Sequence, residues 1–297
     1  MKRTLIFLLL LLLIGCDAIP TPLEMQNPVW VQITEGLNFP EGPAWDSENT
    51  LCFSNCYGHW IGRLRDGKVD TFSLVDSSSI WKSTNGLAVG PDRKLYACDF
   101  EKGQIVRFDS QGRAEIYLDG YRGQRLNRPN DLCFDNDGNL YFTDPQQYDR
   151  TNPDGFVYRL SANDRTVTIA ADQIAFPNGI LMHPDGRSVY VCESAAERIL
   201  KFRIDEEGRL VDRKVYLELP GGDPDGLAMD RAGNLYVAHF GGAAVYIVSP
   251  AGEILKKIPT PGHKPTNITF GGTRGKILYL TEVETNALYY LTAQKRN

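Results

Sequence analysis

Six polar residues recur along the chain at intervals of 41 to 48 residues, and each of them carries a side-chain oxygen atom. They are Glu41, Asn85, Asn130, Asn178, Asp225 and Thr266, and are called the anchor residues below. Oxygen ligands that include two carboxylates suit Ca²⁺, Mg²⁺ or Mn²⁺, whereas the absence of His and Cys argues against a closed zinc site. If the fold brings these positions together, the sequence predicts a site for one divalent cation, with Glu41 and Asp225 neutralising its charge.

Each anchor residue lies in a repeated frame of residues. The segment "RPNDLCFDNDGNLYFTD", which begins at Arg128, returns as "DPDGLAMDRAGNLYVAH", which begins at Asp223. In the second copy, the runs GLAVG, KLYACDF, QIVRFDS and AEIYL are separated by the turn signals PDR, EKG and QGR. A period of 40 to 50 residues with four short strands per unit is typical of a β-propeller. We therefore predict an all-β fold with six blades of four antiparallel strands.

The last copy of the repeat is one strand short. Only three strands fit after Thr266, while "VWVQITEG" stands alone ahead of the first copy. We expect this N-terminal strand to complete the last blade and close the ring, which removes exposed sheet edges. We expect each anchor residue just before the first strand of its blade. Because the innermost strands of a propeller line its channel, the anchor residues would form a ring at one channel mouth. The alternative is that Asn, Asp and Thr only cap turns here, which explains each position singly but not all six together.

Four motifs, taken together, resemble the senescence marker protein (regucalcin), gluconolactonase and luciferin-regenerating enzyme family. They are "FPEGPAWD", "NRPNDLCFDNDGNLYFTDP", "FPNGI" followed by "PDGRSVYV", and "DPDGLAMDRAGNLYVA", and they span essentially the whole mature domain. The family is similar to diisopropyl fluorophosphatase in fold and metal site, and more remotely to paraoxonases. The resemblance implies a six-bladed propeller with a catalytic divalent metal in its channel. Ca²⁺ is the expected ion, with Mg²⁺, Mn²⁺ and Zn²⁺ as alternatives.

The resemblance also implies roles for single residues. Glu41, Asn178 and Asp225 match the recurrent metal ligands of the family, and Asn130 matches a residue that binds metal in some members and substrate in others. Arg128 matches an arginine that contacts substrate in some members; its alternative role is a solvated charge at the channel rim.

Two further anchor residues, Asn85 and Thr266, fill positions where the family varies. We expect them to contact substrate or water rather than metal.

Lactone hydrolysis is the function that these residues favour. The metal would polarise the lactone carbonyl and stabilise the oxyanion, and Asp225 would take a proton from the attacking water, with metal-bound hydroxide as the competing nucleophile. An alternative on the same site is hydrolysis of phosphotriesters or organofluorophosphates. A different class of function is a non-catalytic propeller that binds partners in the cell envelope. If the protein is an enzyme, its expected substrate is a small lactone or ester.

The N-terminus has the pattern of an export signal. Residues 1–16 combine Lys2 and Arg3 with the ten apolar residues 5–14, too few for a membrane-spanning helix, which needs about 20. The sequence "LIGC" resembles a bacterial lipobox, so we expect Cys16 to be lipidated. Residues 17–28 then form a tether and residues 29–297 the propeller. Asp17 resembles a signal for retention in the inner membrane, and we expect a lipoprotein of the cell envelope that faces the periplasm.

Charge limits the partners. The formal net charge is −5, and it becomes −7 once Lys2 and Arg3 are removed with the signal. Without a basic run the protein is not expected to bind nucleic acid, and contact with the membrane is expected only through the lipid. We expect a monomer.

The remaining cysteines and histidines form no reactive motif. Five cysteines are left after removal of the signal, an odd number, so at least one should be unpaired; they are Cys52, Cys56, Cys98, Cys133 and Cys192. His239 falls in a column of polar residues that ends the second strand of each blade, which favours a structural role.

Overall fold

The computed structural model describes residues 20–294 except residue 47, and its regular elements there are β-strands and three single-turn 3₁₀ helices. The second strands of the blades are buried at nearly every position, as in β7 (Leu95–Asp99) and β11 (Leu140–Asp144). Such strands pack on both faces, which explains their continuous apolar runs. Outer strands such as β5 (Lys68–Leu74) have mostly exposed or half-buried side chains, because they form the outer edge of each blade and pair with another strand on one side only.

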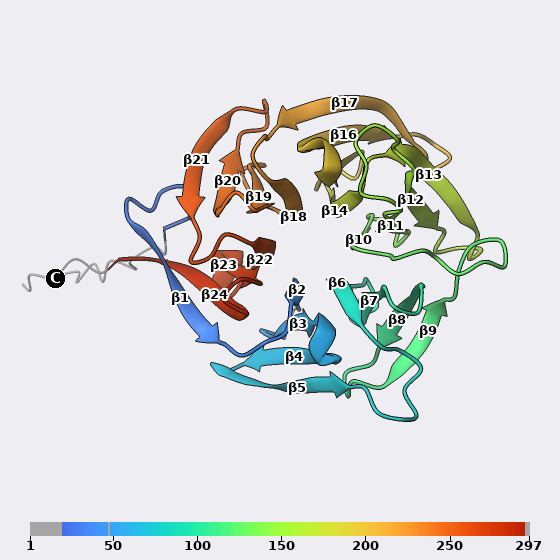
Figure 1. Cartoon of the computed structure of the whole chain (residues 1–297), viewed down its shortest axis with the longest axis horizontal. Helices are drawn as coiled ribbons and strands as arrows, with labels where there is room; N and C mark the ends of the chain where they lie inside the picture. Colours follow the sequence, from blue (N-terminus) through green and yellow to red (C-terminus); the bar gives the residue numbers. More distant parts are fainter. Residues whose placement is uncertain (1–19, 47, 295–297) are drawn as a thin grey trace, which may run out of the picture.

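The strands form six sheets of four strands in the described part of the chain, arranged as blades around a central channel (Figure 1). Blades 1 to 3 contain β2 (Pro40–Trp45), β3 (Leu51–Asn55), β4 (Trp60–Arg65) and β5; β6 (Thr84–Val89), β7, β8 (Gln104–Phe108) and β9 (Ala114–Leu118); and β10 (Leu132–Phe134), β11, β12 (Gly155–Leu160) and β13 (Val167–Ile174). Blades 4 to 6 contain β14 (Pro177–Met182), β15 (Ser188–Glu193), β16 (Arg198–Ile204) and β17 (Leu210–Glu218); β18 (Asp223–Met229), β19 (Leu235–Phe240), β20 (Ala244–Val248) and β21 (Ile254–Pro259); and β22 (Pro265–Gly271), β23 (Ile277–Glu282), β24 (Ala287–Ala293) and β1 (Pro28–Thr34). The 3₁₀ helices are η1 (Cys56–Gly58), η2 (Ser194–Ala196) and η3 (Thr273–Gly275).

The ring closes as the sequence predicts. Strand β1 pairs antiparallel with β24, and the register runs from Pro28 opposite Ala293 to Thr34 opposite Leu288. The first and last strands of the fold thus share one sheet, which leaves β1 as the outer edge of blade 6. The prediction of a six-bladed propeller with an N-terminal closing strand is confirmed.

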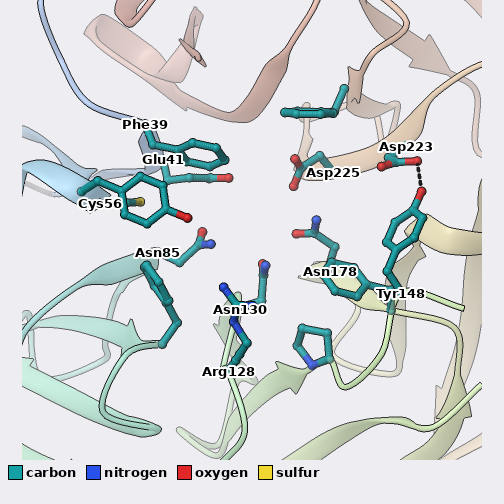
Figure 2. Close-up of a pocket in the computed structure, with 15 residues that line it drawn as sticks. Phe39, Glu41, Cys56, Asn85, Arg128, Asn130, Tyr148, Asn178, Asp223 and Asp225 are labelled. Carbon is teal, nitrogen blue, oxygen red and sulfur yellow. Dashed lines mark hydrogen bonds between the residues drawn. The ribbon is translucent and has the colours of Figure 1, made fainter. Parts of the chain in front are cut away.

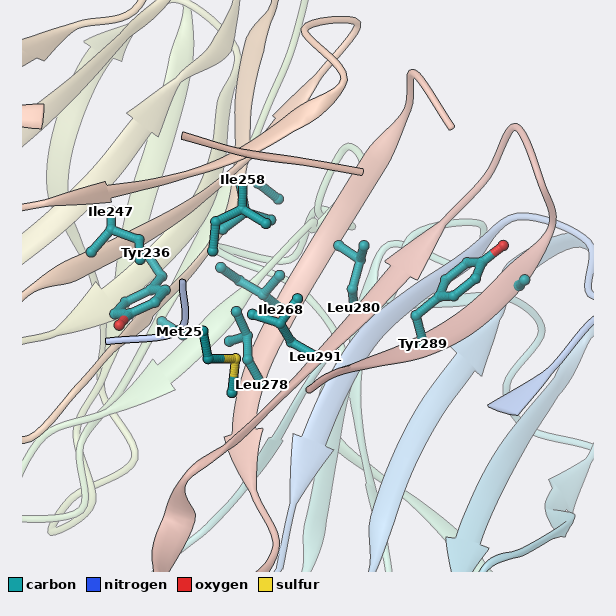
Figure 3. Packing of buried hydrophobic residues seen from close by; sticks show 13 residues of the cluster. Met25, Tyr236, Ile247, Ile258, Ile268, Leu278, Leu280, Tyr289 and Leu291 are labelled. Atoms are coloured by element: carbon teal, nitrogen blue, oxygen red, sulfur yellow. The ribbon is translucent and has the colours of Figure 1, made fainter. Parts of the chain in front are cut away.

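The hydrophobic core lies mainly between neighbouring blades. One cluster joins blades 5 and 6 through residues such as Tyr236, Ile247, Ile268 and Leu278 (Figure 3). Met25, which precedes β1, is buried in the same cluster. Because each blade buries its second strand against both neighbours, the ring is held together by a series of such interfaces.

The segment before β1 is fixed to blade 5. The Nζ of Lys256 donates hydrogen bonds to the carbonyl oxygens of Pro22, Leu23 and Met25, and Met25 packs into the core. Residues 20–27 of the predicted tether therefore lie against the propeller, whereas Cys16 and the predicted signal fall outside the described residues. No helix in residues 20–294 is both long enough and apolar enough to span a membrane.

The innermost strands contain β-bulges at the anchor residues. The register of the first strand against the second shifts between Glu41 and Ala44 in blade 1, and equivalent shifts occur in blades 2, 4, 5 and 6. A bulge changes the direction of a side chain without ending the strand. The sequence predicts the anchor residues just before these strands. In the structure only Asn130 lies before its strand, β10, and the other five lie inside theirs.

Glycines follow four of the anchor residues, and most of them serve close packing rather than turns. A Cβ atom on Gly179 would lie 2.1 Å from the carbonyl oxygen of Asp225, and one on Gly86 would lie 2.7 Å from that of Asn130. Neither residue has a positive φ, so close packing and not a turn requires glycine at these two positions. Gly138 differs, because it has φ +81° in the hairpin turn between Asp135 and Asn139.

Candidate active site in the central channel

A cavity of about 260 Å³ opens at one mouth of the channel. Five of the six anchor residues line it, and their side chains converge as Figure 2 shows: Glu41, Asn85, Asn130, Asn178 and Asp225. They come from five different blades, so the site exists only when the ring is closed. This convergence is what the turn-capping alternative does not explain.

Hydrogen bonds between blades hold the backbone of the anchor residues. The Oγ of Ser54 donates to the carbonyl oxygen of Asn85 over 2.7 Å, and the Oγ1 of Thr143 donates to that of Asn178 over 2.7 Å. Each donor belongs to the blade that precedes its acceptor. The position of one anchor residue is therefore fixed by its neighbour, which gives the ring a defined geometry.

Two carboxylates are buried in this ring. The exposed fractions of Glu41 and Asp225 are 3% and 5%. Burial, with Asp131 nearby, raises the pKa of Glu41 to about 8, although hydrogen bonds from Gly42 and Asn267 oppose the shift. Burial also raises the pKa of Asp225 well above its usual range, and the charge of Glu41 adds to the shift. Two anionic groups so placed repel each other unless a proton or a cation compensates them.

Two buried oxygen atoms in the ring lack a hydrogen-bond partner in the described structure: Oδ1 of Asn85 and Oδ1 of Asp225. Unsatisfied buried oxygen atoms are costly; a hard cation would satisfy Oδ1 of Asp225, and water or a substrate group would satisfy Oδ1 of Asn85. No cluster of three His, Cys, Asp or Glu side chains able to hold a metal occurs in residues 20–294 outside the gap at 47, so amide oxygens have to complete the set. Two carboxylates with several amides fit a Ca²⁺-like ion.

A third acidic residue, Asp131, lines a second cavity, which is formed by residues of the innermost strands. Its carboxylate accepts hydrogen bonds from the backbone N–H groups of Leu132 (2.9 Å) and Ile180 (3.2 Å), and burial raises its pKa to about 7. The sequence prediction did not single it out, because the equivalent position is glycine in four of the six copies. The charge of Asp131 contributes to the raised pKa values of Glu41 and Asp225.

Thr266 does not join the other anchor residues. It is fully buried, is absent from the cavity wall, and its hydroxyl donates to the carbonyl oxygen of Pro40 over 2.9 Å. The same hydroxyl also bonds to Thr281. Thr266 therefore does not face the cavity, where the expected contact with substrate or water would occur. Its hydroxyl instead links blade 6 to blade 1.

Arg128 reaches the cavity wall, as the sequence predicts. It is exposed, and its guanidinium lies 5.9 Å from the ring centroid of Phe100. Its backbone N–H donates to the carboxylate of Asp144, which fixes the loop. Both the substrate role and the rim charge are consistent with this place.

The polar residues that end the second strands bind the loops at the channel mouth to the blades through hydrogen bonds. The carboxylates of Asp99, Asp144 and Glu282 accept backbone N–H groups two or three residues ahead of an anchor residue. His239 occupies the same column; it is buried, its Nε2 lies 3.1 Å from the carbonyl oxygen of Leu219, and burial lowers its pKa. It does not line the cavity, in agreement with a structural role.

Most of the upper wall consists of residues that were not predicted from the sequence. It contains Cys56, Pro145 and Asp223 together with six aromatic residues: Phe39, Tyr57, Phe100, Tyr148, Phe176 and Phe240. Several of these fall two residues before an anchor residue or directly after the polar column, and a comparison of those columns would have found them. All five described cysteines are free thiols.

The fold and the site define a class: six-bladed propellers whose channel mouth carries an oxygen-rich pocket. The chain belongs to the SMP-30/gluconolactonase/LRE-like family, whose model matches residues 39–284. A gluconolactonase from Zymomonas mobilis is 32% identical over 293 residues, covering 87% of this chain and 80% of the relative. A diisopropyl-fluorophosphatase from Loligo vulgaris is 25% identical, covering 91% and 93% of the two chains. The solved structure of a gluconolactonase from Xanthomonas campestris superposes with a TM-score of 0.80 at 30% identity, covering 91% of each chain. The family is thus a lactonase family with an organophosphatase relative.

Proposed function

We propose that this protein is a metal-dependent lactonase. The observation that carries the proposal is the pair of buried carboxylates, Glu41 and Asp225, within a ring of amides that leaves two oxygen atoms unpartnered. The similarity to gluconolactonases over most of the chain supports the reaction class.

The residues that would hold a divalent cation are Glu41, Asn130, Asn178 and Asp225, with Ca²⁺ as the expected ion. Such an ion, when bound, supplies Lewis-acid polarisation of the substrate carbonyl and neutralises the charge that develops on its oxygen. The remaining chemistry belongs to side chains of this chain.

Asp225 is the proposed general base. Its Oδ1 is unpartnered, while an Asn178 hydrogen bond to the carboxylate partly offsets the upward shift of its pKa. As a carboxylate at the wall of the cavity, Asp225 would accept a proton from an attacking water. Arg128 and Asn85, at the wall of the same cavity, would orient the ring oxygen or the substituents of the lactone.

The test of this role replaces Asp225 by asparagine, with Asp212→Asn as the matched control. Asp212 is exposed on β17 and has φ +56°, a conformation that asparagine tolerates. We expect Asp225→Asn to lower kcat for a lactone by about 10²-fold to 10⁴-fold, and the control to stay at the wild-type value. Turnover by Asp225→Asn near the wild-type rate would exclude Asp225 as the base. Calorimetric titration with Ca²⁺ separates loss of the base from loss of the ligand.

A second candidate activity is phosphotriester hydrolysis on the same site. The diisopropyl-fluorophosphatase relative, similar along nearly its full length, favours including it. Rates on a lactone and on an organophosphate, measured with the same preparation before and after chelation, separate the two activities. Higher efficiency on the organophosphate would displace the lactonase assignment.

We further infer that the mature protein is anchored in the cell envelope through lipidated Cys16, by the resemblance of "LIGC" to a lipobox. Incorporation of labelled fatty acid into the wild type, and its loss in Cys16→Ser, tests the anchor. A Cys16→Ser protein that still carries label would place the lipid elsewhere.

A further inference from the structure

Six aromatic side chains surround the pocket above the oxygen ring. They come from blades 1 to 5 and are called the aromatic collar: Phe39, Tyr57, Phe100, Tyr148, Phe176 and Phe240. By contrast, the ring beneath them is entirely polar. The lining of the pocket is therefore mainly aromatic at its mouth and polar at its base.

The collar rings contact each other edge to face. Tyr57 lies 5.3 Å from Phe39 and 6.0 Å from Phe100, measured between ring centroids, and Tyr148 lies 5.2 Å from Phe176. Phe39 and Phe176 have φ angles of +61° and +57°, which are unusual for bulky residues. They precede the first strands of blades 1 and 4, which are opposite each other in a six-bladed ring. The same unusual backbone conformation therefore occurs on two sides of the mouth, and such conformations cluster at functional sites.

The collar is incompletely covered by the protein. Tyr57 and Tyr148 are 47% and 57% exposed, and the other four rings are half-buried. A group of exposed aromatic side chains at a cavity mouth indicates a surface that contacts an apolar ligand.

Polar groups are scarce at the level of the collar. The wall there offers Arg128, the tyrosine hydroxyls and Asp223, and Asp223 already accepts the hydroxyl of Tyr148 over 2.7 Å (Figure 2). A polyhydroxylated lactone would bring several hydroxyl groups against aromatic carbon. Each hydroxyl removed from water without a new partner weakens binding.

We propose that the pocket selects lactones or esters whose carbonyl end is polar and whose remaining body is apolar or aromatic, in preference to sugar lactones. The carbonyl end meets the ring that contains Glu41 and Asp225, and the apolar body lies against the collar. A cavity of about 260 Å³ accommodates one lactone ring with a short substituent. This inference rests on the proposed hydrolase function and names the substrate class of the same site.

The experiment compares two substrates with the same six-membered lactone ring. The full-length protein is loaded with Ca²⁺, and kcat/KM is measured for glucono-δ-lactone and for δ-octalactone, each divided by its uncatalysed hydrolysis rate. We expect a preference of about tenfold or more for δ-octalactone, because discrimination by an apolar pocket is typically of this size. Equal efficiency, or a preference for the sugar lactone, would overturn the proposal.

Variants of the collar tie the preference to these rings. Tyr57→Ala and Phe100→Ala should each lower kcat/KM for δ-octalactone about tenfold and change that for glucono-δ-lactone by less than twofold. The control is Ile116→Ala on the outer strand β9, because Ile116 is 46% exposed, as Tyr57 is, but lies outside the cavity. Equal effects of a folded collar variant on both substrates would contradict recognition by the collar. Because two collar variants are made, failure of one to fold leaves the other to decide.

A binding measurement separates this proposal from the lactonase assignment. An alkyl δ-lactam, which resists hydrolysis, is titrated into the Ca²⁺-loaded wild type and into Tyr57→Ala, with a polyhydroxylated lactam as the comparison. Tighter binding of the alkyl lactam, lost about tenfold in Tyr57→Ala, supports the collar even if neither lactone is turned over, in which case only the lactonase assignment fails. Turnover of lactones together with equal binding of both lactams would overturn the collar and leave the lactonase assignment in place.

Discussion

Replacement of Glu41 by glutamine should make the metal-free protein more stable while it removes metal binding. The pKa of Glu41 is about 8 in the folded protein, against 4.5 for an unperturbed glutamate. Between these values the folded state holds a proton that the unfolded chain has released, so the free energy of unfolding falls as the pH rises through this window. At pH 8 the loss amounts to roughly 4 kcal/mol at 1.36 kcal/mol per pKa unit.

Glutamine carries no charge at any pH and keeps an oxygen that can accept the N–H of Gly42, which donates to Glu41 over 2.9 Å. Its amide N–H group also needs a partner, so we expect about half of the 4 kcal/mol to be recovered, or about 2 kcal/mol. For a domain of this size that corresponds to a rise in Tm of roughly 4 to 8 °C at pH 8. At pH 5 the wild type has lost only about 1 kcal/mol to this titration, which is less than the cost of the amide, so the variant should be no more stable than the wild type there.

Thermal unfolding followed by dye fluorescence, in EGTA and in Ca²⁺ at pH 5 and pH 8, measures the effect. Glu282→Gln is the matched control: Glu282 is fully buried, but its carboxylate accepts N–H groups from Lys264 and Thr285, so the amide should lower Tm at both pH values. Ca²⁺ should raise the Tm of the wild type and not that of Glu41→Gln. A Glu41→Gln protein that is no more stable than the wild type in EGTA at pH 8 would refute the view that the buried charge of Glu41 destabilises the metal-free protein.

Two further predictions concern residues outside the ring. Thr266→Val removes the hydroxyl that links blades 6 and 1, so the free energy of unfolding should fall by about 1 to 3 kcal/mol while kcat/KM stays within twofold of the wild type; a tenfold fall in kcat/KM at an unchanged Tm would return Thr266 to the substrate contacts. Lys256→Met leaves three carbonyl groups of residues 22–25 without their ammonium donor, so limited proteolysis near Met25 should become severalfold faster. Cleavage at the wild-type rate would mean that packing of Met25 alone holds the segment.

The sequence predicts the blades well because their signals are local. Each strand of the second copy was expected to within about two residues of its observed bounds, since short apolar runs and Gly-containing turns alternate along the chain. The ring of oxygen ligands also follows from the repeat, because equivalent positions in a closed propeller converge.

What the sequence does not predict depends on contacts between blades. Thr266 has the right chemistry and the right register, but the carbonyl of Pro40 in blade 1 attracts its hydroxyl away from the cavity. The bulges at the anchor residues and the close approach at Gly179 likewise appear only when neighbouring strands are packed. The collar joins loops from five blades, so no single copy of the repeat reveals it.

The attachment of residues 20–27 to blade 5 determines which way the pocket points. Lys256 is level with Ile247, Tyr236 and Ala228 across the blade, in the half remote from Phe240 at the pocket mouth. A lipid, a fusion partner or a solid support joined ahead of residue 20 therefore pulls on the face opposite the pocket. The mouth is directed away from the attachment, and substrate can diffuse into it from the open solution.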